Sequence, residues 1–417
     1  MSEILNDEIL KLIEKNKAQY FIPENKVPLS SPTFGVEEIA AATLTLASSF
    51  VTSGKKVVQF ESQFAEYIGR KHAIMVNSGS SANFLMISAL CSWQTKILLP
   101  GDEVIVPAVT WPTTIYPIIQ LGLRPIFVDC GKNTLNIDTK KVKAAISDKT
   151  KAIVAVPILG NPCSMKEIES ICSEYSLVLL EDTCESLGSE YNSKKCGSFG
   201  LMSSFSFFFS HHITCIEGGI ITTDDDWLAD VLRCQRAHGW TRDMNRKDEI
   251  NAQYSHIDPR FLFHDLGFNF RSTDVNASIA IIQLKKLDYL NKHRINLANS
   301  LTEKLKKYSD FFEFTEVENK AESTWFGFPF LVKEGAPFNR GEFMRHLEAA
   351  GIETRPIVGG NLARQPAFDH VDWEQRGGLE NADMVHSNGI YFGIHPGMND
   401  RHIDYIDKVF NHFIRSI

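Results

Sequence analysis

Short apolar runs rich in β-branched residues alternate with longer amphipathic stretches through much of the chain. The clearest runs are residues 103–107, 152–157, 177–181 and 219–223. Runs of this length, bounded by turn residues, predict buried strands, and the amphipathic stretches between them predict helices. Pro100, Gly101 and Asp102 supply such a turn before the first run. The pattern predicts an α/β fold with a mostly parallel sheet covered by helices.

The size and composition of the chain fit a large globular protein. It has 417 residues, 43% of them hydrophobic and 23% charged, enough to bury a sizeable core and to form two domains. The formal net charge is -8, so no excess of basic residues is available for a polyanion. Nucleic acid is therefore not an expected partner, and any anionic ligand must be bound by local groups.

We expect three parts along the chain. Residues 1–35 form an N-terminal arm, residues 36–271 form a large domain, and residues 272–417 contain a long helix and a small C-terminal α/β domain. The long helix starts near Ser272 or Thr273, where apolar residues begin to recur at helical spacing.

Three segments after the large domain's predicted strands carry further expectations. In the small domain, residues 325–332 predict a strand and residues 339–351 predict a helix. The polar and poorly periodic segment 242–259 predicts a loop near the mouth of a site.

Targeting and cysteine patterns bear on the compartment. The first residues lack a basic start followed by an apolar core, and the chain nowhere reaches the roughly 18 to 20 apolar residues that span a bilayer. These features predict a cytoplasmic protein with no membrane partner. The eight cysteines are scattered without a C-x-x-C pair, so we expect reduced, mostly structural thiols.

A turn rich in serine and glycine, residues 77–83, lies between an apolar run and a helical pattern. It places the hydroxyls of Ser80 and Ser81, together with free backbone N–H groups, at the start of a helix, where phosphate binds well. A turn of this composition is also typical of an ordinary helix cap. The motif alone leaves both interpretations open.

Two further residues follow predicted strands, at the sheet edge where ligands of open α/β folds bind. Trp111 follows the strand at 103–107 and offers an aromatic face, and Asp182 follows the strand at 177–181 and offers a carboxylate. Each also has a structural interpretation, the first as a core tryptophan and the second as a cap of the next turn.

The segment 204–219, which ends in Glu217-Gly-Gly, resembles the cofactor-binding segment of the DegT/StrS sugar aminotransferase family. In that family a lysine six residues before the Glu-Gly-Gly binds pyridoxal phosphate as a Schiff base, and His211 occupies that position here. An imidazole can transfer protons but forms no stable Schiff base. The resemblance therefore implies noncovalently held pyridoxal or pyridoxamine phosphate and the 3-dehydratase branch of the family.

His212, the neighbour of His211, is a second candidate, and adjacent histidines most often have no chemical role. A metal site is not indicated, because metal-ligand pairs usually lie at i, i+4 spacing and no third ligand accompanies this pair. The spacing to Glu217-Gly-Gly selects His211 as the base.

The resemblance extends from about Gly35 to the C-terminus and implies a fold-type I aminotransferase, with a mostly parallel seven-stranded sheet between helices and a smaller C-terminal α/β domain. It implies that Trp111 stacks on the cofactor ring, that Asp182 binds the ring nitrogen, and that Glu185 lies near the phenolic oxygen or the amine. The implied ligands of the cofactor phosphate are Ser80, Ser81 and Ser206.

Three more positions carry implied contacts. Asn269 matches an asparagine that a partner subunit donates to the cofactor phosphate, which implies a homodimer with a composite active site. His238 and Arg355 match contacts to the sugar nucleotide or to the carboxylate of an amino donor, because a guanidinium pairs well with anionic oxygens.

The activity that the resemblance implies is removal of the C3 hydroxyl from a nucleotide-linked 4-keto-6-deoxy sugar. Glu185 resembles the branch acting on GDP-4-keto-6-deoxymannose, with glutamate as amino donor and His211 as base. The implied product is a 3,6-dideoxy-4-keto sugar for a surface polysaccharide such as lipopolysaccharide O-antigen.

Three alternatives stay open. CDP-4-keto-6-deoxyglucose 3-dehydrase needs closely grouped cysteines for an iron-sulfur cluster, and this chain has none after Cys234, so no cluster is expected. A sugar nucleotide aminotransferase needs a lysine near the cofactor, and Lys194 and Lys195 lie well upstream in a predicted surface turn. A non-catalytic paralogue that only binds sugar nucleotides or a partner is the third alternative.

Overall fold

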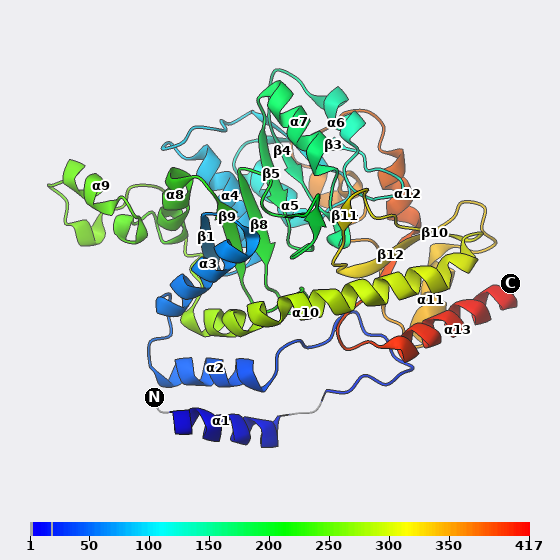
Figure 1. The fold of residues 1–417 in the computed structure, drawn as a ribbon. Helices are drawn as coiled ribbons and strands as arrows, with labels where there is room; N and C mark the ends of the chain where they lie inside the picture. The colour runs from blue at the N-terminus through cyan, green and yellow to red at the C-terminus, as the bar shows by residue number, and fades with distance from the viewer. Residues whose placement is uncertain (1–2, 18–19) are drawn as a thin grey trace.

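The computed structural model of the chain describes residues 3–17 and 20–417, so residues 1, 2, 18 and 19 of the expected N-terminal arm lie outside the described residues. Within those ranges the arm contains helix α1 (Glu3–Asn16), which lies beside α2 (Val36–Ala47) below the body of the molecule (Figure 1).

A mixed, mostly parallel sheet forms the centre of the molecule (Figure 1). Its strands are β1 (His72–Val76), β2 (Glu103–Pro107), β3 (Arg124–Val128), β4 (Thr150–Ala155), β5 (Val178–Asp182), β8 (Met202–Ser206), β9 (Gly219–Thr223) and β14 (Glu374–Gln375). The order among the described residues is β1-β9-β8-β5-β4-β2-β3-β14. Strand β9 is antiparallel to both of its neighbours, β1 and β8, and the other neighbouring pairs of this sheet are parallel. The α/β prediction is confirmed, and the short β14 extends the sheet that was expected.

Alternate residues of each strand face two different helical layers. In β1, Ile74 and Val76 pack with α4 (Gly79–Cys91), α5 (Pro112–Gln120) and α8 (Asp226–Arg236). Ala73 and Met75 pack on the opposite face with α3 (Lys55–Ile68) and α10 (Asp274–Leu305). Helices α6 (Thr139–Ala145) and α7 (Met165–Tyr175) continue that second layer. This two-residue period is what a strand buried on both faces requires.

The C-terminal elements form a smaller antiparallel sheet beside the second half of α10 (Figure 1). Its order is β10 (Phe312–Phe314), β12 (Gly327–Val332), β15 (Gly389–Gly393) and β13 (Thr354–Arg355). Helices α11 (Arg340–Ala349), α12 (Glu380–Asn388) and α13 (Asp400–Ser416) pack against it. Because α10 contributes to both cores, it connects the two proposed domains, whose boundary at residue 271 falls just before it.

Most of the predicted elements lie within one or two residues of the observed ones. β2 and β9 have the predicted bounds, and Thr273 caps α10 by accepting a hydrogen bond from Asn276 N. The strand predicted at 325–332 begins at Gly327 instead. Trp325 has a φ of 49°, a left-handed value that a strand does not accommodate.

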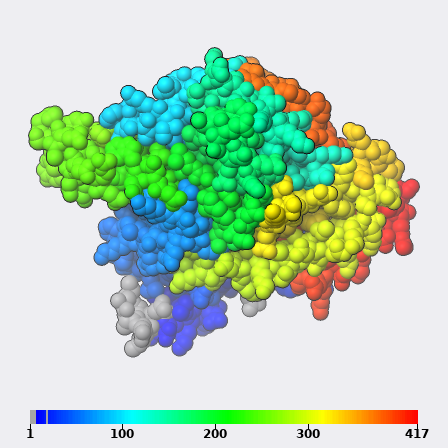
Figure 2. Space-filling model, turned by 45° about the horizontal axis from the view of Figure 1, so that its top comes forward, coloured from blue at the N-terminus to red at the C-terminus, as the bar shows by residue number. Residues whose placement is uncertain are grey.

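The prediction of a loop at residues 242–259 is wrong. The segment contains a short 3₁₀ turn, Thr241–Asp243, and helix α9 (Lys247–Gln253). Asp230 of α8 accepts hydrogen bonds from the backbone N–H groups of Asn245 and Arg246, so the segment is anchored on α8. It projects from the body of the molecule (Figures 1 and 2).

Lys194 and Lys195 lie in a small sheet. Its three strands are β6 (Glu190–Tyr191), β7 (Lys194–Lys195) and β11 (Ala321–Glu322).

All eight cysteines are free thiols. Over the ranges that the structure describes, no helix combines the length and the apolar character needed to cross a membrane.

Candidate active site

The serine-glycine turn caps helix α4 and lies against the end of β8. Ser78 accepts a hydrogen bond of 3.0 Å from the backbone N–H of Ser81. A Cβ atom added at Gly79 would lie 2.6 Å from Cβ of Ser206, so only glycine allows this approach. The structure thus brings the turn, Ser206 and the first N–H groups of α4 together, as a phosphate site requires.

Gly219 closes the other side of this turn. A Cβ atom there would lie 2.3 Å from the carbonyl oxygen of Ser78. The second glycine of the Glu217-Gly-Gly motif is therefore required sterically, because Gly219, the first residue of β9, lies directly against the turn. Ser80 is exposed and Ser81 is half-buried at the start of the helix.

Asp182 is buried at the end of β5 and is held by three donors. The amide of Asn83 and the hydroxyl of Thr114 each donate to its carboxylate at 2.7 Å. The backbone N–H of Cys184 donates at 3.2 Å. A buried carboxylate with this many donors is fixed in position.

Trp111 lies close to this network. It caps α5, and its carbonyl accepts a hydrogen bond of 3.1 Å from the N–H of Thr114, the residue that binds Asp182. Its side chain is 56% exposed, which excludes the alternative of a core tryptophan. The indole face is available to a ligand next to Asp182.

Glu185 is half-buried, and its carboxylate accepts a hydrogen bond of 2.9 Å from the N–H of Leu159. Burial raises the pKa of Glu185 to about 7, the negative charge of Asp182 acts in the same direction, and the Leu159 N–H opposes both. A carboxyl group with a pKa near neutrality can either hold or release a proton at physiological pH.

His211 lies in the loop between β8 and β9 and contacts the segment that follows β5. Its ring packs 5.1 Å from the ring of Phe326 and 6.4 Å from that of Phe208. Burial lowers the pKa of His211 to about 4, a hydrogen bond with the backbone of Cys184 opposes this, and the positive charge of Arg294 adds to it. Its Nδ1 has no hydrogen-bond partner among the described residues. The imidazole is neutral at physiological pH. It contacts the backbone of Cys184, which lies between Asp182 and Glu185 in the chain.

His212 has a different environment. It is fully buried, and its Nε2 lies 3.0 Å from the hydroxyl of Thr324. Burial lowers its pKa well below the ordinary value. The two adjacent histidines therefore point to different surroundings, His211 toward the site and His212 into the core.

His238 and Asn269 form a separate exposed cluster with Arg271. A guanidinium nitrogen of Arg271 lies 3.1 Å from Nε2 of His238 and 3.1 Å from the side-chain oxygen of Asn269. No hydrogen bond of the described residues joins Asn269 to Ser206. The backbone of this cluster nevertheless lies next to the phosphate turn of its own chain, because Arg271 pairs with Val76 and the N–H of Asn77 donates to the carbonyl of Phe270 at 2.9 Å.

Arg355 lies on β13 directly opposite Tyr391 of β15. The guanidinium is exposed and donates only to the carbonyl of Thr354, at 2.7 Å. Burial raises the pKa of Tyr391 to about 12; the charge of Glu185 acts in the same direction and that of Arg355 opposes it. The charges of Arg355 and Glu185 thus both act on Tyr391, a residue of the small domain.

Sequence reasoning missed four residues of this neighbourhood. They are hydrogen-bond donors to Asp182 or rings beside His211 and Glu185, namely Asn83, Thr114, Phe326 and Tyr391. The segment after Trp111 offered a signal for Thr114, because hydroxyls in the first helical turn after a strand end can reach a carboxylate at the same edge of the sheet. Asn83 ends the serine-glycine motif, whereas Phe326 and Tyr391 come from distant parts of the chain and carry no local signal.

These residues fit pyridoxal phosphate. The glycine-dependent cradle formed by Gly79 and Ser206 suits a phosphate, and Trp111 offers an uncovered aromatic face. The buried carboxylate of Asp182 suits a protonated ring nitrogen. His211 offers an unpartnered buried nitrogen instead of an amine.

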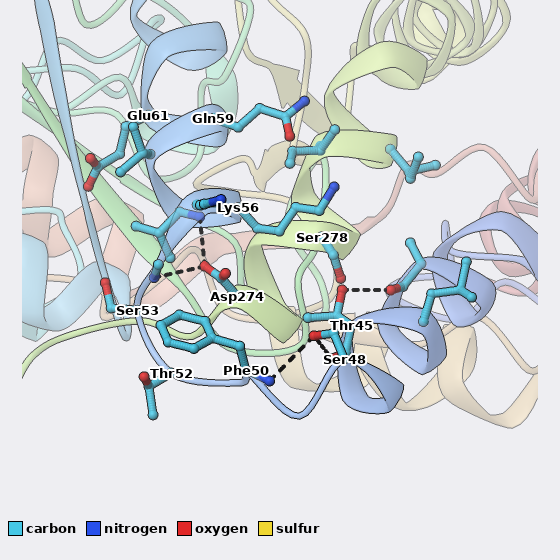
Figure 3. A pocket seen from close by; sticks show the side chains of 18 of the residues that line it. Thr45, Ser48, Phe50, Thr52, Ser53, Lys56, Gln59, Glu61, Asp274 and Ser278 are labelled. Carbon is cyan, nitrogen blue, oxygen red and sulfur yellow. Dashed lines mark hydrogen bonds between the residues drawn. The ribbon is translucent and has the colours of Figure 1, made fainter. Parts of the chain in front are cut away.

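A cleft of about 1730 Å³ lies elsewhere, between α2, α3, the start of α10 and the end of α8 (Figure 3). In it, Asp274 accepts hydrogen bonds from the backbone N–H groups of Gly54 and Val57 and so caps α3. None of the candidate site residues lines this cleft. Arg236 on its wall is already paired with Glu61 at 2.5 Å.

The doubly covered, mostly parallel sheet, the small antiparallel domain and this cradle define a fold-type I aminotransferase architecture. The chain belongs to the DegT/DnrJ/EryC1/StrS aminotransferase family, whose model matches residues 32–411. Members of this family depend on pyridoxal phosphate.

Several relatives share a more specific description. The chain is 42% identical to GDP-4-keto-6-deoxy-D-mannose 3-dehydratase of Escherichia coli O55:H7, over 92% of this chain and 98% of that protein. It also resembles a solved structure of a histidine-to-asparagine variant of GDP-4-keto-6-deoxymannose-3-dehydratase with bound GDP-perosamine. That match has a TM-score of 0.87 and 41% identity, over 92% of this chain and 100% of the other. A structure of the same enzyme with a trapped PLP-glutamate geminal diamine matches with the same TM-score, identity and coverage.

Proposed function

We propose that the protein is a pyridoxal or pyridoxamine phosphate-dependent 3-dehydratase whose substrate is GDP-4-keto-6-deoxymannose. The observation that carries the proposal is that a neutral imidazole, His211, lies beside the Asp182 segment where the family's lysine is expected. The 42% identity to a GDP-4-keto-6-deoxy-D-mannose 3-dehydratase supports the choice of reaction and of nucleotide.

The lysines nearest in sequence are occupied elsewhere. Lys194 lies over the ring of Phe199, at 4.4 Å from its centroid. Lys195 lies 3.6 Å from a carboxylate oxygen of Glu190 and over the ring of Tyr67. Both therefore belong to the small β7 sheet, which argues against an aminotransferase cycle that uses either amine.

The cofactor, when bound as pyridoxamine phosphate, supplies an amine for the sugar ketone and a ring that accepts electrons. Asp182 is suited to hold the proton of its ring nitrogen, because the carboxylate is buried and fixed by Asn83 and Thr114. Trp111 is suited to cover one face of the ring. The phosphate ligands that we assign are Ser80, Ser81 and Ser206.

His211 and Glu185 divide the proton transfers in this proposal. His211 is neutral and accepts the proton from C4′ of the cofactor. The same proton, carried by His211, then reaches the departing C3 oxygen of the sugar. Glu185, with a pKa near 7, is the second group able to donate to that oxygen.

The balance of the reaction follows. Glutamate supplies the amino group and two electrons and leaves as 2-oxoglutarate. The C3–O bond of the sugar breaks with loss of water, and hydrolysis then releases ammonia and a 3,6-dideoxy-4-keto sugar. No external reductase or iron-sulfur cluster is needed, because the electrons come from glutamate. Such a sugar is suited to surface polysaccharide such as lipopolysaccharide O-antigen.

A second copy of the chain completes the site in this proposal. Asn269 and His238 are exposed, and among the described residues Asn269 makes no hydrogen bond to Ser206, so both side chains are available to a partner's cofactor and sugar nucleotide. Arg355 is exposed and available to the anionic groups of the sugar nucleotide or glutamate. We further propose a cytoplasmic location, which agrees with eight free thiols.

The experiment is incubation of the purified protein with pyridoxal phosphate, glutamate and GDP-4-keto-6-deoxymannose, without a reductase. Mass spectrometry follows the sugar, and a coupled assay follows ammonia. We expect a 3-deoxy-4-keto sugar and one ammonia per turnover. An aminated sugar that keeps its C3 oxygen would establish an aminotransferase instead. Parallel incubations with CDP- and dTDP-linked substrates test the choice of nucleotide.

A further inference from the structure

Arg294 on α10 is a buried cation without a carboxylate partner. Its side chain is 2% exposed, and no described acidic group lies within ion-pair distance of it. The guanidinium donates from one nitrogen to the carbonyl of Trp325, at 3.2 Å, and to the carbonyl of Ile394. Its Nε has no partner among the described residues. A buried charge in this state is unusual, because burial favours paired ions.

The two carbonyl acceptors lie at the start of β12 and just after the end of β15. At the first of them the backbone is strained, because Trp325 has a φ of 49°. Gly160 packs closely against the backbone of Trp325, and a Cβ atom added at Gly160 would lie 2.7 Å from the nitrogen of Trp325. The guanidinium thus fixes the carbonyl of a strained residue.

The residue after this strained position touches the candidate base. The ring of Phe326 packs 5.1 Å from the ring of His211 and 6.3 Å from that of His212. The N–H of Phe326 donates to Leu159 O at 2.8 Å, and Leu159 N binds Glu185. A change at Arg294 is therefore expected to move the wall against which the imidazole rests.

The positive charge of the same guanidinium also acts on three buried histidines. Burial is the main reason that the pKa values of His211, His212 and His395 are lowered, and the charge of Arg294 adds to the effect at all three. A second positive charge on any of these rings is disfavoured next to an unpaired guanidinium.

We propose that Arg294 is a positioning residue for His211: it holds the Trp325–Phe326 wall against the imidazole and brings an unpaired positive charge to the same buried region. The base role of His211 rests on the proposed function. The packing of the ring rests on the geometry alone.

Two ionisable neighbours of His211 stand out among the described residues: His212, next to it on the same loop, and Cys184, whose backbone bonds to the ring. The carboxylates on either side of Cys184 in the chain, Asp182 and Glu185, are engaged with donors of their own. The rings that pack on His211, Phe326 and Phe208, are not ionisable.

The test is an NMR titration of the imidazole in the full-length protein, with ¹³C-labelled histidine, with and without pyridoxal phosphate. The chain has 13 histidines, and the His211 signal is identified as the one missing from His211→Asn. The variants are Arg294→Met, which removes the charge, and Arg294→Lys, which keeps it. Arg401→Met, at an exposed arginine of α13, is the matched control.

For the wild type and Arg401→Met we expect His211 to stay neutral down to pH 5. In Arg294→Met the midpoint should move up but stay below about 6.5, the ordinary histidine value, because burial, the larger cause of the lowered pKa, remains. The acid limb of the kcat profile should shift upward in parallel. Arg294→Lys should keep the wild-type midpoint but lower kcat, because one ammonium cannot reproduce the guanidinium's contacts.

An unchanged midpoint in folded Arg294→Met would overturn the inference. If that variant does not fold, the wild type decides, because a His211 midpoint near 6.5 in the unaltered protein also overturns it. The titration midpoints need no sugar substrate. A protein that keeps a neutral His211 but dehydrates no sugar would therefore refute the proposed function and leave the effect of Arg294 standing.

Discussion

Thr114 donates a hydrogen bond of 2.7 Å to the buried carboxylate of Asp182. The bond joins the first turn of α5 to the end of β5. Helix α5 follows β2, and β4 lies between β2 and β5 in the sheet. Trp111, three residues earlier, is thereby held beside the same carboxylate. The relationship explains how an exposed aromatic ring and a buried acid can address one ligand.

The Thr114–Asp182 bond predicts a loss of cofactor affinity in Thr114→Val. Removing a donor to a buried charged group costs about 1.5–3 kcal/mol, so pyridoxal phosphate should bind roughly tenfold to hundredfold more weakly. Equilibrium dialysis measures the change. Thr113→Val, at the neighbouring half-buried threonine, should bind as the wild type does. Equal affinities for the two variants would contradict the role given to Asp182.

The contact of Gly79 with Ser206 predicts that Gly79→Ala closes the phosphate cradle. The added methyl would lie 2.6 Å from Cβ of Ser206 and 3.1 Å from the sulfur of Cys184. We expect at least a tenfold loss of phosphate-dependent binding and a destabilisation of about 1–3 kcal/mol. Gly341→Ala, in the first turn of α11 with no contact below 3.3 Å, is the control and should be neutral. Unaltered binding in Gly79→Ala would place the phosphate elsewhere.

The raised pKa of Glu185 predicts that the free energy of unfolding of the cofactor-free protein decreases as the pH rises. Its folded-state pKa, about 7, lies above the ordinary value of 4.5, so the folded state binds a proton that the unfolded state has lost between these values. Stability from this group is therefore full below pH 4.5 and is lost as the pH rises through 7. Urea unfolding at pH 8 should find Glu185→Gln more stable by on the order of 1–3 kcal/mol.

Below pH 4.5 the advantage of Glu185→Gln should vanish, and Glu322→Gln, at an exposed position, should change stability at neither pH. A constant difference across the whole range would mean that the carboxyl group does not titrate as assigned.

Buried histidines predict the opposite dependence on the acid side. Burial, with Arg294 adding to it, lowers the pKa of His395 to about 3 against an ordinary 6.5, and its bond to the carbonyl of Pro28 opposes them. The unfolded chain binds the proton first, so stability is full above about pH 6.5 and falls as the pH decreases below it, by up to about 1.4 kcal/mol per unit.

His395→Gln should flatten the fall of unfolding free energy between pH 6.5 and 5, as measured by urea titration at each pH. The exposed His370→Gln is the control and should leave the slope unchanged. Identical slopes for both variants would rule out a proton-linked contribution from His395.

Local patterns predicted the strands and the long helix because their signals lie within single segments. The bounds of β2 and β9 and the capping of α10 by Thr273 are of this kind. The loop expected at 242–259 was wrong because distant parts of the chain hold α9: Asp230 anchors the residues just before the helix, and Ile250 is buried in a small cluster with Cys234 and Leu262.

The candidate site divides in the same way. Residues that end a strand or cap a helix, such as Asp182 and Trp111, were found from the sequence. Tyr391 and Arg294 were not, because their relation to Glu185 and His211 depends on the small domain and α10 folding back against the large sheet. The strained Trp325 likewise has no signature in the sequence.

The central claim, that His211 carries the proton transfers, is tested most directly by comparing His211→Asn with His212→Asn. Ammonia release from glutamate and GDP-4-keto-6-deoxymannose is measured for both, with circular dichroism to verify folding. The account predicts a loss of about a hundredfold or more for His211→Asn, the usual contribution of a general base. His212→Asn should be less stable but keep turnover within about tenfold of the wild type. Full turnover by folded His211→Asn, or equal losses in two folded variants, would contradict it.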